Sequence, residues 1–379
     1  GSEPKIFLKP KSVSGSIYRP TGEISGFLFF AITKVTKLRI FHVKKIIMKC
    51  IVSLFLLLLQ VQLLAAQTET TYAEKLGYPK GAKIIILHID DMGMSYDSNL
   101  GGIEAMTKGV ANSCSVMMPC PWVPGFVHYM KQHPGLDAGL HLTLTSEWKD
   151  YRWGPLSGKP KTPGLVDTEG AMWRGVADVV KHASADEVET EIRAQVDRAK
   201  TMGFEPTHLD SHMGTLFATP AFIERYIKVG IDYQIPVMFP GGHNTLIAQE
   251  LKNTSADMQM AREAGKTLWN AGLPVLDDLY NDSYSWKPSP GIYANDKKLQ
   301  SYKTQKYIEV LKSLKPGITM IIMHCTNTSE TFQHISDSGP TRRGDYLAMV
   351  DPALKKFIEK EGIVLTTWRE MKERRQKFR

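Results

Sequence analysis

Polar side chains gather at the ends of short apolar segments in this chain. Asp90 and Asp91 directly follow the apolar run 84–89, and His324 directly follows the run 318–323. The carboxyl ends of parallel strands meet along one rim, where such folds build their active sites. Carboxylates and imidazoles gathered at one rim could bind a metal ion and transfer protons.

The adjacent carboxylates of Asp90 and Asp91 have an expected geometry. If the strand continues through them, their side chains point to opposite faces. One carboxylate could then bind a metal ion while the other faces the reacting water. Acidic pairs also occur in ordinary turns and helix caps. This pair therefore indicates a metal site only in combination with the histidines elsewhere in the chain.

Histidines supply candidates for the remaining ligands. His141 lies in the otherwise apolar stretch 139–144, where a histidine buried for packing is the ordinary alternative. His208, Asp210 and His212 fall within five residues. Packing explains this second group poorly, because buried polar groups must each find partners. One aspartate and two histidines form a three-ligand set for a catalytic zinc-like ion and leave one position for water.

The elements that must position these residues alternate between short apolar runs and amphipathic stretches. This order predicts an α/β fold with a parallel sheet, here an irregular β/α barrel of about seven to eight strands in a single catalytic domain. A doubly wound open sheet is the alternative. The expected strands are 84–89, 113–118, 138–144, 207–210, 236–239, 275–276, 318–323 and 363–367. The expected helices are 99–108, 185–202, 219–229, 256–271, 299–314 and 345–360, the second with a capping box of Ser184 and Glu187.

Charge is distributed unevenly along the chain. The 379 residues carry a formal net charge of +8, and residues 1–66 alone account for it with ten Lys/Arg against two Asp/Glu. The remaining 313 residues are formally neutral, so the basic excess does not indicate nucleic-acid binding. The sequence also lacks a Walker loop, a dinucleotide-binding glycine motif and a Gly-x-Ser-x-Gly elbow, which argues against those enzyme classes.

The first residues differ in character from the rest. Residues 1–47 are expected to be a protease cleavage scar, Gly1-Ser2, followed by upstream sequence from a misplaced start. Residues 48–66 combine a basic start, an apolar run and a small-residue exit, which predicts a signal peptide, with a membrane anchor as the alternative. A linker at 67–82 and the catalytic domain at 83–379 are expected to follow. We therefore expect a secreted or periplasmic mature protein without a stable membrane span.

Three cysteines remain after the signal peptide, namely Cys114, Cys120 and Cys325. An odd number is no disulfide framework. A Cys114–Cys120 bridge stays open as an alternative, and buried free thiols are the expected state. The sequence is compatible with a homo-oligomer and shows no pattern that would define one.

Taken together, these segments resemble the YdjC-like family of chitooligosaccharide and other carbohydrate deacetylases. The family's motifs occur in the family's order between Lys83 and Arg369. They are Asp90-Asp91-Met92-Gly93, Gly139-Leu140-His141-Leu142, Thr207-His208-Leu209-Asp210-Ser211-His212, His324 and Arg343. Two segments differ, because Met213-Gly214-Thr215 replaces further histidines and Cys325 replaces a common proline. These differences leave the expected metal-binding residues unchanged. They imply that the substrate pocket differs from that of the family.

The resemblance implies a metal-dependent hydrolase that removes N-acetyl groups from amino sugars or oligosaccharides. By this resemblance, Asp91, His141 and His212 would bind one divalent metal ion. Zinc is the expected ion, and magnesium or another divalent ion is the alternative, because an Asp-His-His site accepts several. The expected partner is an acetylated amino-sugar substrate rather than a nucleic acid.

The resemblance also implies roles for the polar residues beside the ligands. Asp90 would be the catalytic base and His324 the general acid. His208 and Asp210 would orient the ligands, and Arg343 would do the same or contact the substrate.

Two other functions remain open at this stage. The chain could be a metal-dependent hydrolase that cuts another carbohydrate bond, glycosidic or ester, or a glycan-binding protein without turnover. Two long insertions, 146–173 and 280–296, are rich in Trp, Tyr, Pro and Gly. Such loops usually border an active site, and their aromatic rings could stack on sugars or only pack the loops.

Overall fold

The strand β1, Lys83–Met92, lies in the middle of the sheet and is buried on both faces. Ile84 and Ile86 pack in one apolar cluster together with Trp368. Ile85 and Leu87 pack in a second, larger cluster on the other face. A strand covered on both faces carries apolar residues on both of them, which explains why residues 84–87 show no alternation.

This computed structural model describes residues 45, 48–49, 51–53, 70–252 and 254–378. Thr70–Arg379 forms one compact unit. Most of the expected leader, 1–47, and of the expected signal peptide, 48–66, lies outside the described residues. Among the described residues, none of the helices combines the length and apolar character needed to cross a membrane.

The sheet has seven strands, and every pairing between them is parallel. Their order is β4-β3-β2-β1-β6-β5, and β7 pairs with the start of β1. The other strands are β2 (Ser113–Val116), β3 (Ala138–Leu142), β4 (Leu209–Ser211), β5 (Asp278–Tyr280), β6 (Gly317–Met323) and β7 (Val364–Leu365). The parallel α/β fold predicted from the sequence is confirmed.

The strands do not close into the barrel of seven to eight continuous strands that the sequence predicted. Between β4 and β5, only two isolated bridges continue the pairing, Leu209 with Val237 and Pro240 with Leu276. The expected strands in this region are short and contain or adjoin prolines. Proline has no N–H group to donate to a ladder, so pairing there stops after single bridges. The result is a half-barrel of parallel strands.

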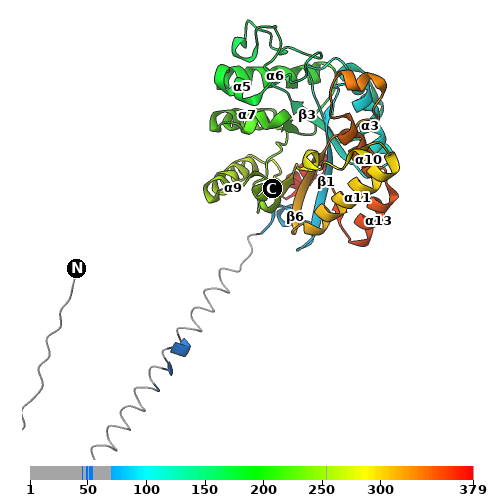
Figure 1. The fold of residues 1–379 in the computed structure, drawn as a ribbon. Helices are drawn as coiled ribbons and strands as arrows, with labels where there is room; N and C mark the ends of the chain where they lie inside the picture. Colours follow the sequence, from blue (N-terminus) through cyan, green and yellow to red (C-terminus); the bar gives the residue numbers. More distant parts are fainter. Residues whose placement is uncertain (1–44, 46–47, 50, 54–69, 253, 379) are drawn as a thin grey trace, which may run out of the picture. The chain divides into compact units, whose positions relative to one another are not determined.

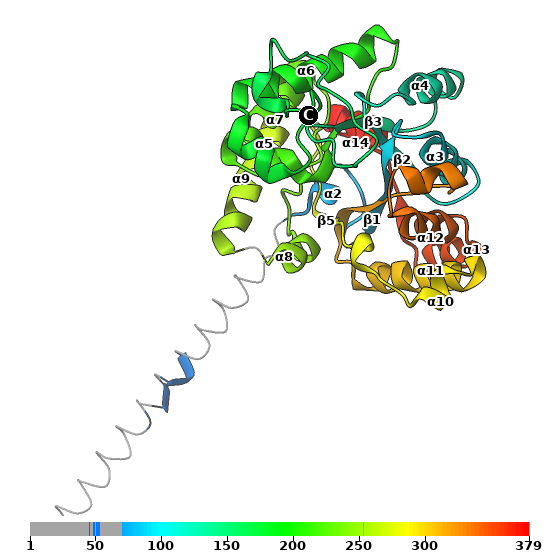
Figure 2. The same ribbon diagram turned by 45° about the horizontal axis from the view of Figure 1, so that its top comes forward.

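Helices surround these strands. Figures 1 and 2 place α6, α7 and α9 on one side of the strands and α3, α11 and α13 on the other. The α-helices are α2 (Tyr72–Lys75), α3 (Tyr96–Thr107), α4 (Val123–Gln132), α5 (Val176–His182), α6 (Ala185–Thr201), α7 (Pro220–Tyr233), α8 (Thr245–Leu251), α9 (Ser255–Asn270), α10 (Pro290–Tyr293), α11 (Asp296–Ser313), α12 (Gly339–Met349), α13 (Pro352–Lys360) and α14 (Trp368–Lys377). Short 3₁₀ helices are η1 (Pro163–Leu165), η2 (His212–Phe217), η3 (Ser283–Ser285) and η4 (Glu330–His334).

Two helix predictions have clear outcomes. The capping box of Ser184 and Glu187 at the start of α6 is confirmed. The single helix expected at 345–360 is instead two helices, α12 and α13. Proline inside a helix breaks its hydrogen bonding but fits the first turn. Pro352 therefore begins α13, and the side chain of Asp351 caps that helix by accepting a hydrogen bond from the Ala353 N–H at 2.9 Å.

Three cysteines in the described unit, Cys114, Cys120 and Cys325, are buried free thiols. The expectation of free thiols is confirmed. Burial raises the pKa of each thiol well above its usual value. These side chains therefore act as small apolar packing groups.

Candidate metal centre and active site

Three ligand atoms from three different strand ends converge in the interior of the fold. Asp91 Oδ1 lies 3.3 Å from His141 Nε2 and 3.4 Å from His212 Nδ1. The three atoms lie within 4.8 Å of one another, and all three residues are buried. We call Asp91, His141 and His212 the metal centre.

The donor atoms of the metal centre fit a divalent cation. Asp91 Oδ1 is buried and accepts no hydrogen bond, although two imidazole nitrogens point toward it. A buried carboxylate oxygen without a partner is costly unless something else satisfies it. Two imidazole nitrogens and one carboxylate oxygen are the ligands that zinc and related ions take in catalytic sites.

The backbone at Asp91 explains how two adjacent carboxylates reach the same site. We expected the strand to continue, with Asp90 and Asp91 on opposite faces. Instead, the register between β1 and β2 shifts between Ile89 and Met92, and Asp91 has a φ of 65°. Aspartate tolerates this left-handed conformation better than most residues. As a result, both carboxylates lie near His141 Nε2, at 3.7 Å for Asp90 Oδ2 and 3.3 Å for Asp91 Oδ1.

A buried guanidinium compensates the charge of Asp91. Arg342 Nη1 lies 2.7 Å from Asp91 Oδ2, and both side chains are almost fully buried. Burial opposes ionisation of Asp91, but the Arg342 charge and contacts with the two histidine ligands hold its pKa well below the usual value. Arg342 also donates to Ser338 Oγ at 2.7 Å and lies over the ring of Tyr284, 5.5 Å from its centroid.

A second layer of polar side chains lies beneath the metal centre. His141 Nδ1 is 2.6 Å from Asp210 Oδ1, so Asp210 orients the ring that presents Nε2 to the centre. His88 Nε2 lies 2.9 Å from Asp210 Oδ2 and 3.2 Å from Asp90 Oδ1. His208 Nε2 is 3.6 Å from the same Asp210 oxygen. Asp210 therefore connects the metal centre to a buried pair of histidines.

The ring of His88 carries a proton at neutral pH. Burial disfavours the imidazolium, but hydrogen bonds and charges from Asp210 and Asp90 outweigh it and raise the pKa of His88 to about 9. The Oγ atoms of Ser113 and Ser115 lie 3.0 and 3.1 Å from the two ring nitrogens. This cation therefore stabilises two buried carboxylates at once.

His208 has the opposite electrostatic environment. It is completely buried, it stacks on Trp368, and burial lowers its pKa. Its Nδ1 lies 3.0 Å from the Thr207 hydroxyl. His208 therefore stays neutral at neutral pH and packs against Asp210 as part of the support for the centre.

Asp90 is the carboxylate best placed to accept a proton beside the metal centre. Its Oδ1 contacts His88, while Oδ2 lies 3.7 Å from His141 Nε2 and 3.9 Å from His324 Nε2. Oδ2 is therefore directed toward the centre without a close hydrogen-bond donor among these histidines.

His324 forms another wall of the site. Burial and the nearby charge of Arg342 lower the pKa of His324 to about 4, so the ring is neutral at neutral pH. Its Nδ1 has no hydrogen-bond partner, and Tyr284 packs edge-on at 4.4 Å between ring centroids. The backbone N–H of His324 donates to Asp345 Oδ2 at 3.2 Å, which fixes the end of β6.

A carboxylate contacts the ring nitrogen of His212 that does not face Asp91. Its Nε2 lies 3.1 Å from Glu147 Oε2. Burial lowers the pKa of His212, but the charges and contacts of Glu147 and Asp91 outweigh it and raise the pKa to about 9. A carboxylate behind a metal-ligating histidine fixes the ring and makes it a stronger ligand.

The structure brings seven of the eight sequence-predicted residues together. These are Asp90, Asp91, His141, His208, Asp210, His212 and His324. Arg343 is not among them, because its guanidinium pairs with Asn327 at 2.8 Å and with Asp296 at 2.7 Å. The preceding residue, Arg342, contacts Asp91 in its place.

Sequence reasoning missed four residues of the site, namely His88, Glu147, Tyr284 and Arg342. A signal existed for His88, because it precedes Asp90 by two positions in a strand and must share its face. Glu147 and Tyr284 lie in the insertions, which have no periodicity that could assign a direction.

Two other groups of carboxylates and histidines could also hold an ion by geometry alone: His88, His208 and Asp210, and Asp90, His141 and Asp210. Both compete with hydrogen bonds that already exist. Asp210 Oδ1 is engaged with His141, and His88 contacts two serines through its two ring nitrogens. The metal centre at Asp91 is therefore the site that the donor atoms favour.

The aromatic residues of the first insertion pack against one another. Trp148 and Trp153 have ring centroids 5.4 Å apart, and Tyr151 lies 5.8 Å from Trp153. The Tyr151 hydroxyl donates to the carbonyl of Met94. These rings therefore hold the insertion against the residues that follow β1.

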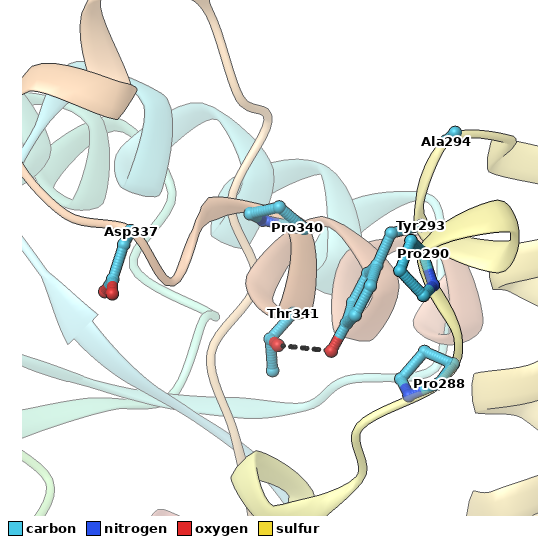
Figure 3. A pocket seen from close by; sticks show the side chains of 7 residues that line it. All are labelled: Pro288, Pro290, Tyr293, Ala294, Asp337, Pro340 and Thr341. Carbon is cyan, nitrogen blue, oxygen red and sulfur yellow. Dashed lines mark hydrogen bonds between the residues drawn. The ribbon is translucent and has the colours of Figure 1, made fainter.

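A shallow pocket of about 500 Å³ lies beside the second insertion (Figure 3). It is lined by Pro288, Pro290, Tyr293, Ala294, Asp337, Pro340 and Thr341. Tyr293 and Thr341 contact each other in its lining, with their hydroxyl oxygens 3.2 Å apart. None of the residues of the metal centre lines this pocket.

Comparison with known proteins places this arrangement in a family. A carbohydrate deacetylase of Thermus thermophilus is 28% identical over 302 residues, which cover 79% of this chain and 97% of that protein. A chitooligosaccharide deacetylase of Yersinia enterocolitica is 32% identical over 135 residues, 34% of this chain and 49% of that protein.

A solved structure shares the fold. The crystal structure of a proposed cellobiose-phosphate cleavage protein from Enterococcus faecalis has a TM-score of 0.60 at 21% identity, and covers 76% of this chain and 98% of its own. Residues 84–360 match the family described as YdjC-like protein. Since this match spans well over half of the sequence, the chain belongs to the YdjC-like family.

Proposed function

We propose that this protein is a metal-dependent deacetylase that hydrolyses the N-acetyl group of amino sugars or their oligosaccharides. The observation that carries the proposal is the unpartnered Oδ1 of Asp91 between His141 Nε2 and His212 Nδ1, with Asp90 beside it. The deacetylase activity named for the relatives from Thermus thermophilus and Yersinia enterocolitica supports the same reaction.

The donor set supports zinc as the ion. Two imidazoles and one carboxylate suit zinc, while cobalt, nickel or manganese are compatible with the same ligands. Magnesium is less suited because it prefers oxygen ligands. When bound, such an ion lowers the pKa of a water ligand toward neutrality and polarises a carbonyl group.

Asp90 has the position of the catalytic base. Its Oδ2 is directed toward the metal centre and accepts the proton of the attacking water, which adds to the acetyl carbonyl carbon. The contact between Asp90 Oδ1 and the protonated His88 keeps the carboxylate oriented. General-base help of this type contributes about 10²–10⁴-fold to a rate.

His324 has the position of the general acid, although it is neutral in the resting site. Its pKa of about 4 means that it must gain a proton before it can donate one. The nearest source is the proton accepted at Asp90 Oδ2, 3.9 Å from His324 Nε2. Transfer through His324 to the departing nitrogen breaks the C–N bond and yields acetate and a free amine.

The first test is acetate release from N-acetylglucosamine oligosaccharides by metal-stripped protein, with and without added zinc. Acetate that depends on zinc supports the proposal. A new reducing end without acetate would indicate cleavage of a glycosidic bond, and sugar binding without either product would indicate a glycan-binding protein. Both results would refute the proposed reaction.

Variants test the assignment of roles. Asp90→Asn is expected to retain zinc and lose turnover by about 10²–10⁴-fold. His141→Ala is expected to lose zinc and turnover together. Asp186→Asn is the matched control, since this aspartate is exposed at the start of α6. Normal turnover by Asp90→Asn would remove it as the base.

We further propose that the protein acts outside the cytoplasm. The basic start, apolar run and small-residue exit of residues 48–66 support export. Fractionation of cells that express the natural chain, combined with N-terminal sequencing of the product, tests this. A product that keeps residues 48–66 and stays in the cytoplasm would contradict export.

A further inference from the structure

Two exposed aromatic residues follow the carboxyl ends of the neighbouring strands β1 and β2. Tyr96 begins α3 just after β1, and Trp122 lies just before α4 after β2. Tyr96 is 55% exposed and Trp122 is 46% exposed, and their ring centroids are 5.3 Å apart. We call these two residues the aromatic pair.

The exposure of Trp122 is unusual within this protein. The other six tryptophans are buried or half-buried. Large aromatic rings gain free energy from burial, and exposed apolar groups that lie together often mark binding sites. The aromatic pair therefore differs from the rings of the two insertions, which pack against the protein itself.

The backbone of Trp122 is tied to the end of β1, close to Asp91. The Trp122 N–H donates to the Gly93 carbonyl at 3.1 Å, and Asn99 Nδ2 donates to the Trp122 carbonyl at 3.0 Å. Asn99 Oδ1 accepts from the Gly93 N–H at 2.7 Å. Gly93 is two residues from Asp91, a separation of at most about 7 Å between Cα atoms.

Close packing at Gly93 fixes this arrangement further. Gly93 has a φ of +83°, and a Cβ there would come within 2.6 Å of the Val123 side chain. Because Val123 follows Trp122, the end of β1 and the start of α4 approach so closely that position 93 has no room for a side chain. The backbone position of Trp122 is therefore set by contacts with the turn that follows Asp91.

From these contacts we propose that the aromatic pair binds a second sugar ring of an N-acetylated oligosaccharide while the first ring lies at the metal centre. The apolar C–H face of a pyranose ring packs on an aromatic face, and rigid rings bind at low entropic cost. This inference rests on the proposed deacetylase function and specifies its substrate as an oligosaccharide rather than a monosaccharide.

The pocket of Figure 3 is the competing position for the second ring. Its aromatic residue, Tyr293, is half-buried, and its hydroxyl is already paired with Thr341 at 3.2 Å. The neighbouring Arg342 is directed at Asp91 and does not line the pocket. The aromatic pair is thus the more exposed platform, and it is tied to the backbone beside Asp91.

The test compares N-acetylglucosamine and its β-1,4-linked oligomers of two to four rings as substrates for acetate release with zinc. We expect kcat/KM to rise from one ring to two. Trp122→Ala should lower kcat/KM for the oligomers about tenfold, the change that 1.4 kcal/mol produces, and leave the monosaccharide within twofold. Tyr96→Ala should act in the same direction.

Control variants separate this proposal from its alternatives. Met260→Ala removes an exposed apolar side chain of α9 and should change nothing. If Tyr293→Ala abolishes the preference for oligomers while Trp122→Ala does not, the second ring lies in the pocket and the proposal is wrong. Equal kcat/KM for all lengths also overturns it, whereas release of no acetate from any of them refutes the deacetylase function itself.

A binding measurement checks the platform without turnover. Calorimetric titration of metal-stripped protein with the four-ring oligomer should give a Kd about tenfold weaker for Trp122→Ala than for the unaltered protein. An unchanged Kd would contradict the contact. Far-ultraviolet circular dichroism and the thermal unfolding midpoint must match between the two proteins, so that misfolding is not mistaken for lost binding.

Discussion

A buried ion pair behind His324 offers a sharp test of how the site is held. Lys303 Nζ lies 2.8 Å from Asp345 Oδ1, and both side chains are completely buried. Lys303 also donates to the Ser283 carbonyl at 3.1 Å, and the Tyr307 hydroxyl donates to the same Asp345 oxygen at 2.8 Å. Asp345 Oδ2 accepts the backbone N–H of His324. The pair thus links α11, α12, η3 and the end of β6.

The substitution Lys303→Met keeps most of the side-chain volume and removes the ammonium group. Asp345 then retains two hydrogen bonds but loses its ion-pair partner in the protein interior. Breaking a buried ion pair by removing one partner costs about 3–5 kcal/mol, because the remaining charge is uncompensated. We therefore expect the free energy of unfolding, measured by urea denaturation at pH 7, to fall by that amount.

Two further variants complete this experiment. Lys306→Met on the same helix removes an exposed lysine whose contact is Glu309 at 3.0 Å, and should cost less than about 1 kcal/mol. The double variant Lys303→Met/Asp345→Leu removes both charges and should recover much of the loss. If Lys303→Met lies within 1 kcal/mol of the unaltered protein, or if the double variant is the least stable, the reasoning fails.

Three other predictions concern the metal centre and the buried His88 beneath it. Chelation should lower the midpoint of thermal unfolding, and added zinc should raise it in a concentration-dependent way, because the ion binds only the folded state. A midpoint that changes with neither treatment would argue against an ion at this site. The pKa of His88 is raised from 6.5 to about 9 on folding, so its stabilising contribution is complete below pH 6.5 and is lost as the pH rises through 9. The free energy of unfolding of the unaltered, metal-stripped protein should therefore fall between pH 6.5 and 9. The fall should be smaller in the metal-stripped His88→Asn variant, and urea denaturation at several pH values measures both. Asp91→Asn and Asp91→Ala should both lose zinc, measured by elemental analysis, but Ala should be less stable by about 1 kcal/mol because it is less tolerant of the left-handed backbone.

The sequence could locate most of the site because rim positions follow from strand order alone. Asp90, Asp91 and His324 end apolar runs, and parallel strands bring such ends together whatever the details of packing. The direction of a helical side chain is harder to predict, since neighbouring residues in a helix point about 100° apart. The resemblance implied a role for Arg343, ahead of the helix expected at 345–360. In the structure α12 already begins at Gly339, and Arg342 rather than Arg343 contacts Asp91.

Closure of the sheet could not be predicted from apolar runs. The segments 236–239 and 275–276 have the composition of strands, and each does pair, but only through single bridges. Whether a ladder continues depends on N–H donors along its edge, and prolines remove donors on both sides of this gap. The split of 345–360 into α12 and α13 has the same origin, because Pro352 cannot lie inside one continuous helix.

The largest difference between expectation and structure concerns the two adjacent aspartates. A regular strand would separate their side chains, so that one carboxylate bound the ion and the other approached from the opposite face. The left-handed conformation of Asp91 places both on one side, where their like charges repel. Two cations offset this repulsion from different directions: Arg342 contacts Asp91 Oδ2 at 2.7 Å, and His88 contacts Asp90 Oδ1 at 3.2 Å. Each carboxylate thus keeps one oxygen next to its own cation and directs the other toward the centre, a division that suits the ligand and base roles proposed above for these neighbouring residues.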